Sequence, residues 1–261
     1  MQRIHSVGHI LRSRLSARAL RGLAAVAVCC LALPLPAQVP AVAYRPFRHY
    51  GERTEQFARE EPIDSSDIVM LGNSLTENGG DWSRLLGAAG VVNRGISGDD
   101  ATGMAHRLVQ ILPGRPRAVF LMAGVNDLSH GLAPAAVAAG VERVVELIRR
   151  GSPATRLFVQ SLLPIDEGAG RWPRLAGRSA AIAEVNRLLA GYCRANGIVF
   201  IDLYPKFVRR GTRELRRELS RDGLHLTPQG YKLWAFELRR HVRSLGAGAP
   251  GVAAGASAIY K

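Results

Sequence analysis

Five short apolar segments recur along the chain at wide intervals, and longer segments with a helical repeat lie between them. The apolar segments are rich in β-branched residues and show no polar alternation, which is typical of strands buried on both faces of a parallel sheet. They are residues 67–71, 91–93, 118–122, 157–161 and 198–201. Hydrophobic positions at helical spacing predict amphipathic helices over residues 137–148, 182–192 and 231–245, with Thr227 as the N-cap of the last.

This alternation of strands and helices predicts a doubly wound α/β sandwich formed by a single domain over residues 64–245. Residues 38–63, rich in proline and charge, are expected to form an N-terminal extension. Residues 246–261 are rich in glycine and alanine and are expected to be a disordered tail. In such a sheet, ligands bind where the strands end, so the loops at their carboxyl ends are the places to look for chemistry.

The first residues match the pattern of a secretory signal. Residues 1–21 carry five arginines and no acidic residue, and residues 22–33 contain no charge before Pro34 interrupts the run. This predicts a signal peptide over residues 1–37, with cleavage there or as late as residue 43, and an exported protein, periplasmic or secreted. The alternative is that the segment stays attached as an anchor. After cleavage no stable membrane span is expected, because the apolar run is shorter than the ~20 residues that cross a bilayer.

The strongly basic composition suggests nucleic-acid binding as a second possibility, but the distribution of the arginines argues against it. The formal net charge is +14. However, the arginines are dispersed along the chain and are not interleaved with aromatic residues, so no nucleic-acid partner is expected. Only 3 cysteines are present, which excludes a disulfide scaffold, and Cys193 is predicted to be a structural helix residue. The histidines are too scattered to predict a metal site.

Four loops that follow predicted elements carry residues capable of acyl-transfer chemistry. Ser74 follows the first strand, Gly98 the second and Asn126 the third, while Asp222 and His225 lie just before the last helix. Serine becomes a nucleophile when a histidine takes its proton and a carboxylate orients that histidine. The backbone N–H groups of Ser74 and Gly98 and the amide of Asn126 could stabilise the oxyanion. Together these residues predict a serine hydrolase.

The four blocks resemble those of the SGNH hydrolases, also called the GDSL esterase/lipase family: Ser74, Gly98, Gly124 to Asp127, and Asp222 with His225. The resemblance covers about residues 64–245. It implies a flavodoxin-like three-layer α/β/α sandwich with a mostly parallel five-stranded sheet, no metal and no organic cofactor. One departure is visible, because Asn73 stands where the family usually has aspartate. Asparagine keeps the short polar side chain, so activity is expected to survive.

Three further stretches carry a narrower resemblance, to a branch that includes platelet-activating-factor acetylhydrolase-like proteins and bacterial carbohydrate O-acetylesterases. They are residues 93–98, 160–164 and 222–227. This branch implies the release of acetyl or short acyl groups from a carbohydrate, with a small-molecule or glycan ester as the partner. The alternative within the family is a lysophospholipase or acyl-thioesterase.

Two other functional interpretations compete with an esterase. A non-catalytic binding protein on the same fold is expected to have lost at least one catalytic residue, and none is missing here. A nucleotide-binding domain is disfavoured, because residues 72–79 contain neither a dinucleotide fingerprint nor a Walker loop.

A cluster of arginines precedes the Asp222 loop and has two interpretations. Five arginines lie within residues 209–217. Either they form a solvated surface, or Arg213, Arg216 and Arg217 border the cleft and bind an anionic substrate, since arginine pairs with carboxylate or phosphate. The oligomeric state cannot be read from the sequence.

Overall fold

The computed structural model describes residues 46–246. The signal peptide predicted over residues 1–37 lies outside the described residues. Of the tail predicted over residues 246–261, the first residue ends the last helix, and residues 247–261 lie outside the described residues. In the described part of the chain, no helix is both long enough and apolar enough to cross a membrane.

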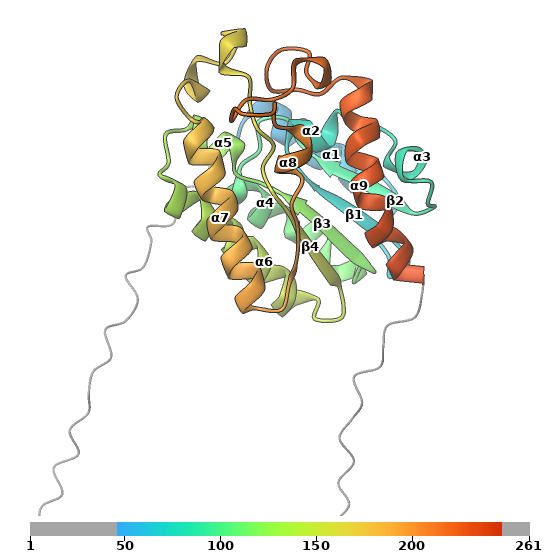
Figure 1. The fold of residues 1–261 in the computed structure, drawn as a ribbon. Coiled ribbons are helices and arrows are strands. Elements are labelled where there is room, and N and C mark those ends of the chain that lie inside the picture. The colour runs from blue at the N-terminus through green and yellow to red at the C-terminus, as the bar shows by residue number, and fades with distance from the viewer. Residues whose placement is uncertain (1–45, 247–261) are drawn as a thin grey trace, which may run out of the picture. The chain divides into compact units, whose positions relative to one another are not determined.

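A five-stranded, all-parallel sheet forms the centre of the molecule (Figure 1), as the sequence predicts. Its strands lie in the order β2-β1-β3-β4-β5. They are β1 (Ile68–Gly72), β2 (Val91–Gly95), β3 (Ala118–Met122), β4 (Arg156–Gln160) and β5 (Val199–Ile201). The central strands β1 and β3 are buried at every position, which explains their continuous apolar sequence.

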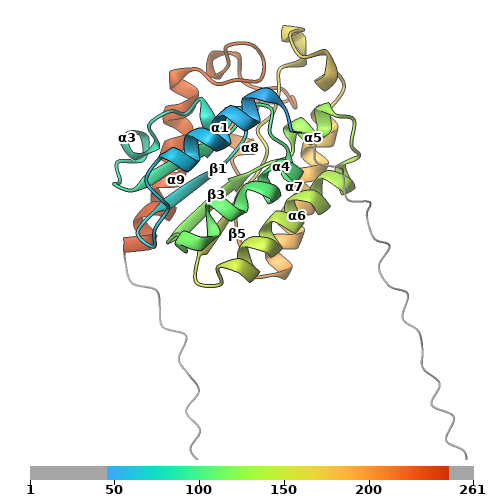
Figure 2. The same cartoon turned by 180° about the vertical axis from the view of Figure 1, so that it is seen from behind.

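Helices cover both faces of this sheet. Helices α1 (Arg48–Arg59), α4 (Ala101–Arg107) and α6 (Pro134–Gly151) lie on the face seen in Figure 2. Helix α9 (Pro228–Gly246) lies on the opposite face together with α3 (Trp82–Leu86), and α7 (Ser179–Ala195) packs against α6 and β5. Three short helices, α2 (Ser74–Glu77), α5 (Val125–Ser129) and α8 (Tyr204–Phe207), each begin within a few residues of a strand end.

The predicted helix α9 begins where its capping residues indicated. Pro228 is its first residue, and the hydroxyl of Thr227 accepts a hydrogen bond from the backbone N–H of Gly230 at 3.2 Å. Its apolar face places Trp234 edge-on against Trp82 of α3, with ring centroids 5.0 Å apart. Tyr231 and Trp234 of this helix therefore belong to the core, whereas Phe236 is exposed.

The segment before β1 contains a helix that the sequence analysis did not predict. Helix α1 buries Tyr50 and Phe57, which form a small second core with Ile96 of the loop after β2. These two aromatic residues lie seven positions apart, on one face of the helix. Residues 48–59 of the predicted N-terminal extension therefore form a helix that packs against the loop carrying Gly98.

Candidate active site

The loops that carry the predicted catalytic residues meet at one edge of the sheet and line a single cavity of about 610 Å³. Ser74 lies at the start of α2, directly after β1, and Asn126 lies in α5, directly after β3. Gly98 and His225 come from loops and complete the inner wall. The structure thus brings together residues separated by up to 151 positions.

Ser74, His225 and Asp222 form a continuous hydrogen-bonded chain. The Nε2 atom of His225 lies 3.0 Å from the Oγ of Ser74, and its Nδ1 lies 2.8 Å from the Oδ2 of Asp222. With the imidazole proton on Nδ1, the histidine donates to the carboxylate and accepts from the serine hydroxyl. This is the arrangement of nucleophile, base and orienting carboxylate that activates a serine.

The Asp222 carboxylate is held by its own loop. Its Oδ1 accepts the backbone N–H groups of Leu224 at 3.0 Å and His225 at 2.8 Å. Partial burial disfavours the charge, but these bonds and the imidazole outweigh it, so the pKa of Asp222 lies below its ordinary value. Gly223 makes the turn possible. Its φ is +91°, and a Cβ there would lie 2.6 Å from the carbonyl oxygen of Asp166.

The turn that presents Ser74 depends on the two residues before it. Asn73 is fully buried, and its side chain accepts the backbone N–H of Leu75 at 3.0 Å, which caps α2. A Cβ on Gly72 would lie 2.1 Å from the Oγ1 of Thr76, so only glycine fits there. An uncharged asparagine therefore supplies the cap at the position where the family usually has aspartate.

Three donors surround the cavity beside Ser74. The backbone N–H groups of Ser74 and Gly98 have no acceptor among the described residues. The Nδ2 of Asn126 donates one hydrogen to the carbonyl oxygen of Asp99 at 2.7 Å, which leaves its second hydrogen for a ligand. Gly98 has a φ of +87°, and a Cβ there would lie 3.2 Å from the ring of Phe47, so glycine suits this position.

A buried ion pair supports this wall of the cavity. The Nε of Arg107 donates to Asp99 at 2.8 Å, and its other nitrogens donate to the carbonyl oxygens of Arg94 and Gly72 at 2.8 and 2.9 Å. Arg107 therefore connects the ends of β1 and β2 to the residue whose carbonyl orients Asn126. The sequence analysis did not identify this arginine, because nothing near it in the chain signals a partner.

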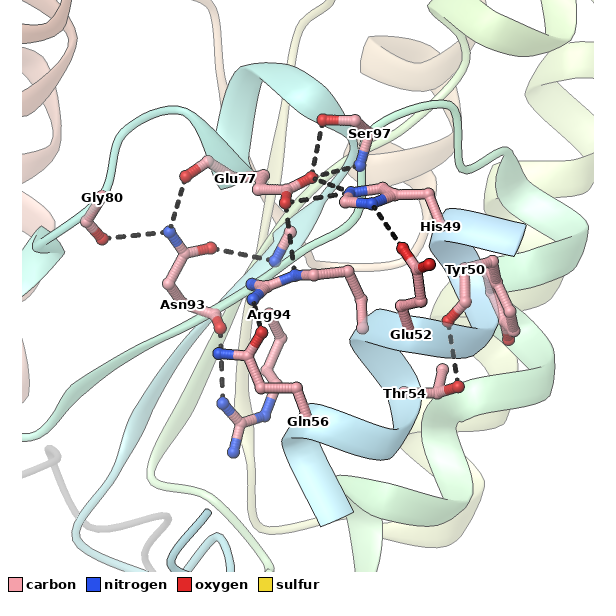
Figure 3. A network of polar contacts seen from close by, with 12 residues as sticks. His49, Tyr50, Glu52, Thr54, Gln56, Glu77, Gly80, Asn93, Arg94 and Ser97 are labelled. Carbon is pink, nitrogen blue, oxygen red and sulfur yellow. Dashed lines mark hydrogen bonds and ion pairs between the residues drawn. The ribbon is translucent and has the colours of Figure 1, made fainter. Parts of the chain in front are cut away.

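Helix α1 contacts Glu77 of α2, the helix that begins with Ser74, as Figure 3 shows. The Glu77 carboxylate accepts the backbone N–H and the hydroxyl of Ser97, the latter at 2.6 Å. From α1, the Nε2 of His49 lies 3.1 Å from both carboxylate oxygens. The Nε of Arg53, also in α1, lies 3.2 Å from one of them. Burial opposes the charge of Glu77, but the hydrogen bonds from Ser97 and His49 hold its pKa below the ordinary value.

The outer wall of the cavity includes a short 3₁₀ helix, Pro173–Leu175, and the tryptophan before it. The Trp172 ring meets His225 edge-on, with centroids 5.1 Å apart, and its Nε1 donates to the carbonyl oxygen of Asp222 at 3.1 Å. Sequence reasoning missed Trp172, whose only signal was an aromatic residue in a loop without a periodic pattern.

The arginine cluster of residues 209–217 does not line this cavity. Arg216 pairs with Glu218 at 2.8 Å, and Arg217 pairs with Asp166 at 3.3 Å. Arg213 likewise is absent from the cavity wall. The structure therefore does not bring these three residues to the triad, and the arginine that does line the cavity is Arg174.

Two other sequence expectations concern metals and Cys193. Residues 46–246 contain no cluster of three histidine, cysteine, aspartate or glutamate side chains that could hold a metal ion. Cys193 lies buried in α7, where burial raises the pKa of its thiol to about 11. A thiol of this kind stays protonated at neutral pH, which agrees with a structural residue.

Comparison with known proteins shows the family to which the chain belongs. Residues 70–233 match the model of the GDSL-like Lipase/Acylhydrolase family. The chain is 29% identical over 183 residues to the platelet-activating factor acetylhydrolase IB subunit alpha1 of Rattus norvegicus, covering 67% of this chain and 75% of the relative.

Solved structures share the fold. A GDSL-like lipase from Bacteroides thetaiotaomicron superposes with a TM-score of 0.65 at 22% identity, covering 75% of this chain and 97% of that one. A carbohydrate esterase family 3 protein from Talaromyces cellulolyticus gives 0.55 at 17%, covering 70% and 100%. The chain therefore belongs to the GDSL-like lipase/acylhydrolase family and is an ester hydrolase.

Proposed function

We propose that this esterase releases acetyl or another short acyl group from a carbohydrate through a Ser-His-Asp acyl-enzyme mechanism. The observation that carries the proposal is the nature of the cavity wall beside the triad. Beyond the reacting residues, the polar part of the wall consists of Asn78, Ser97, Ser129, His130 and Arg174, and the apolar part is short, formed by Trp172, Pro173, Leu175 and Leu224. Polar groups of this kind hydrogen-bond sugar hydroxyls, whereas a long acyl chain needs a continuous apolar wall.

The aromatic ring at the rim supports the same substrate. Trp172 is 38% exposed, so part of its ring is open to a ligand beside His225. An indole ring offers an apolar surface to the C–H groups of a sugar, while its N–H is already occupied by Asp222. The name of one relative, an acetylhydrolase, agrees with a short acyl group, and the name of a structural neighbour, a carbohydrate esterase, agrees with a sugar substrate.

In the proposed reaction, the Oγ of Ser74 attacks the ester carbonyl while the Nε2 of His225 takes its proton. Asp222 holds the imidazole in the required tautomer and stabilises its charged form. The N–H groups of Ser74 and Gly98 and the Asn126 amide stabilise the negative oxygen of the tetrahedral intermediate. His225 then gives the proton to the sugar oxygen as its bond to the carbonyl carbon breaks, and the sugar leaves as an alcohol. Water, deprotonated by the same histidine, attacks the acyl-enzyme, releasing the carboxylic acid and Ser74.

A series of p-nitrophenyl esters from acetate to palmitate tests the acyl group, and acetylated xylan tests the carbohydrate. We expect kcat/KM to be highest for acetate or butyrate and acetate to be released from the xylan. A maximum at palmitate would instead support the lysophospholipase or acyl-thioesterase alternative. The Ser74→Ala variant is the control, because any activity that it retains does not come from this site.

We also propose that the enzyme acts outside the cytoplasm, on the basis of the signal pattern in residues 1–37. Expression of the full chain followed by N-terminal sequencing tests this proposal. A mature protein that begins between residues 38 and 44 would support export with cleavage, and recovery of the intact chain from the cytoplasm would contradict it.

A further inference from the structure

A second cavity, of about 510 Å³, lies next to the active-site cavity and shares Asn78 with it. Its wall is connected to the catalytic residues. The hydroxyl of Tyr231 in α9 donates to the carbonyl oxygen of Leu75 in α2 at 2.9 Å, and the backbone N–H of Arg221 donates to the carbonyl oxygen of His225 at 2.8 Å. A ligand that fills both cavities would pass over the side chain of Asn78.

Basic side chains dominate the charge of this second cavity. Arg84 of α3, Arg221, and Lys232 and Arg239 of α9 line it and are exposed. We call the cavity lined by these four residues the basic cavity. A single carboxylate, that of Asp81, lies in the same wall, and it accepts the backbone N–H of Arg84 at 2.9 Å as the cap of α3.

Among the described residues, no carboxylate forms an ion pair with the cations of the basic cavity. Within residues 46–246, the side chains of Arg84, Arg221 and Lys232 have neither a hydrogen-bond partner nor an ion-pair partner. Arg239 donates only to a backbone carbonyl, that of Leu85, at 2.9 Å. The surface arginines Arg216 and Arg217, by contrast, are each paired with a carboxylate. Unpaired cations gathered around one cavity raise the local concentration of anions.

We propose that the basic cavity binds carboxylate groups of an acidic glycan while an acetyl ester of the same glycan lies at Ser74. This inference rests on the proposed function and specifies its substrate class. Guanidinium groups match carboxylates in shape and charge. The cations come from three separate elements, α3, the loop before Asp222 and α9, so they suit several carboxylates spaced along a polymer. A chain of uronic acids carries one carboxylate on every sugar and extends beyond the scissile ester.

A binding experiment that does not depend on catalysis tests the proposal first. The Ser74→Ala protein is titrated with unacetylated polygalacturonate by calorimetry, with and without the added changes Arg84→Gln, Arg221→Gln and Lys232→Gln. We expect the triple change to weaken binding about tenfold (about 1.4 kcal/mol), because each exposed ion pair contributes a fraction of this. Added salt should weaken binding of the parent protein, since exposed charges are screened over ~10 Å at 0.1 M.

A matched control removes the same charge elsewhere. Arg143, Arg149 and Arg194 are exposed on α6 and α7, away from both cavities. Their replacement by glutamine should leave the affinity for polygalacturonate within about twofold, since only long-range attraction is lost. An equal loss in both triple variants would overturn the proposal, because it would show that net charge alone attracts the polymer.

Two further results separate this inference from the proposed function. In otherwise wild-type protein, the triple change in the basic cavity should raise KM for acetylated polygalacturonate about tenfold more than KM for acetylated xylan. Equal effects on both polymers would overturn the inference while leaving the esterase proposal intact. Binding of phosphatidylglycerol vesicles through these residues, without binding of polygalacturonate, would also overturn it. Failure to hydrolyse either polymer, with polygalacturonate binding preserved, would count against the carbohydrate esterase function alone.

Discussion

The carboxylate of Glu77 accepts two hydrogen bonds from Ser97, one from its backbone N–H and one from its hydroxyl. Glu77 lies in α2, one turn after Ser74, and Ser97 directly precedes Gly98. A single side chain therefore connects the helix of the nucleophile with the loop that carries the second oxyanion donor. From the other side, His49 and Arg53 of α1 contact the same carboxylate.

Replacing Glu77 with glutamine should lower kcat while leaving KM nearly unchanged. Glutamine can keep one bond to Ser97 but loses the charge, so Gly98 is held less firmly in the geometry that the transition state requires. We expect a loss on the order of tenfold, the equivalent of about one charged hydrogen bond. Steady-state kinetics on p-nitrophenyl acetate measure it.

The matched control is Glu55→Gln, which removes an exposed carboxylate that pairs with Arg59 on the outside of α1. This variant should have normal kinetics. A Glu77→Gln protein with unchanged kcat would show that Ser97 does not need this anchor. A rise in KM alone would assign Glu77 to substrate binding instead.

Ser74→Ala or His225→Ala should lower kcat by about 10⁴-fold or more, because each removes an essential part of a unit that works only as a whole. Ser74 is 7% exposed and the change removes one oxygen, so the thermal midpoint should move little. Kinetics on p-nitrophenyl acetate with a melting curve on the same samples measure both. Near-normal turnover by the purified Ser74→Ala protein would disprove its role as the nucleophile.

The Asn126→Ala variant should behave differently from the triad variants. Loss of one preorganised oxyanion donor costs on the order of 10²–10³ in kcat. KM should change little, since the free hydrogen of Asn126 is directed at charge that develops only in the transition state. A variant in which only KM rises would show that this amide binds the ground state.

Asp127, the neighbour of Asn126, should make the stability of the protein depend on pH. It is 4% exposed, and burial together with the nearby Asp100 raises its pKa to about 7. In the unfolded chain the pKa of this residue is about 3.9. Between this value and the folded pKa, the folded state therefore binds one proton more than the unfolded state. The stabilisation of the folded state by protonated Asp127, measured as free energy of unfolding, is therefore fully present below about pH 4. It is lost as the pH rises through about 7.

The Asp127→Asn variant should lack this dependence. Urea unfolding of both proteins between pH 4.5 and 8.5 measures it, and the variant should gain free energy of unfolding relative to the wild type as the pH rises. A difference between the two proteins that stays constant with pH would show that Asp127 does not titrate in this range.

Local sequence patterns predicted the framework of this fold because they act over a few residues. A continuous apolar run identified each strand, and the observed limits of β3 coincide with the predicted residues 118–122. Thr227 and Pro228 marked the start of α9 for the same reason. Helix α1 escaped prediction because its burial depends on a distant partner, since Tyr50 and Phe57 pack on Ile96.

The sequence by itself determined the type and order of the reactive residues, because the triad chemistry requires particular side chains in loops that follow strands. The tertiary structure alone decided which groups meet. The 3.0 Å between Ser74 and His225 joins positions 151 residues apart, and the basic cavity gathers Arg84, Arg221 and Lys232 from separate elements. The arginines of residues 209–217, adjacent in sequence to Asp222, lie outside the cavity wall. Proximity along the chain does not predict proximity in space. The crossover connections of a parallel sheet bring distant residues together and carry sequence neighbours to different places.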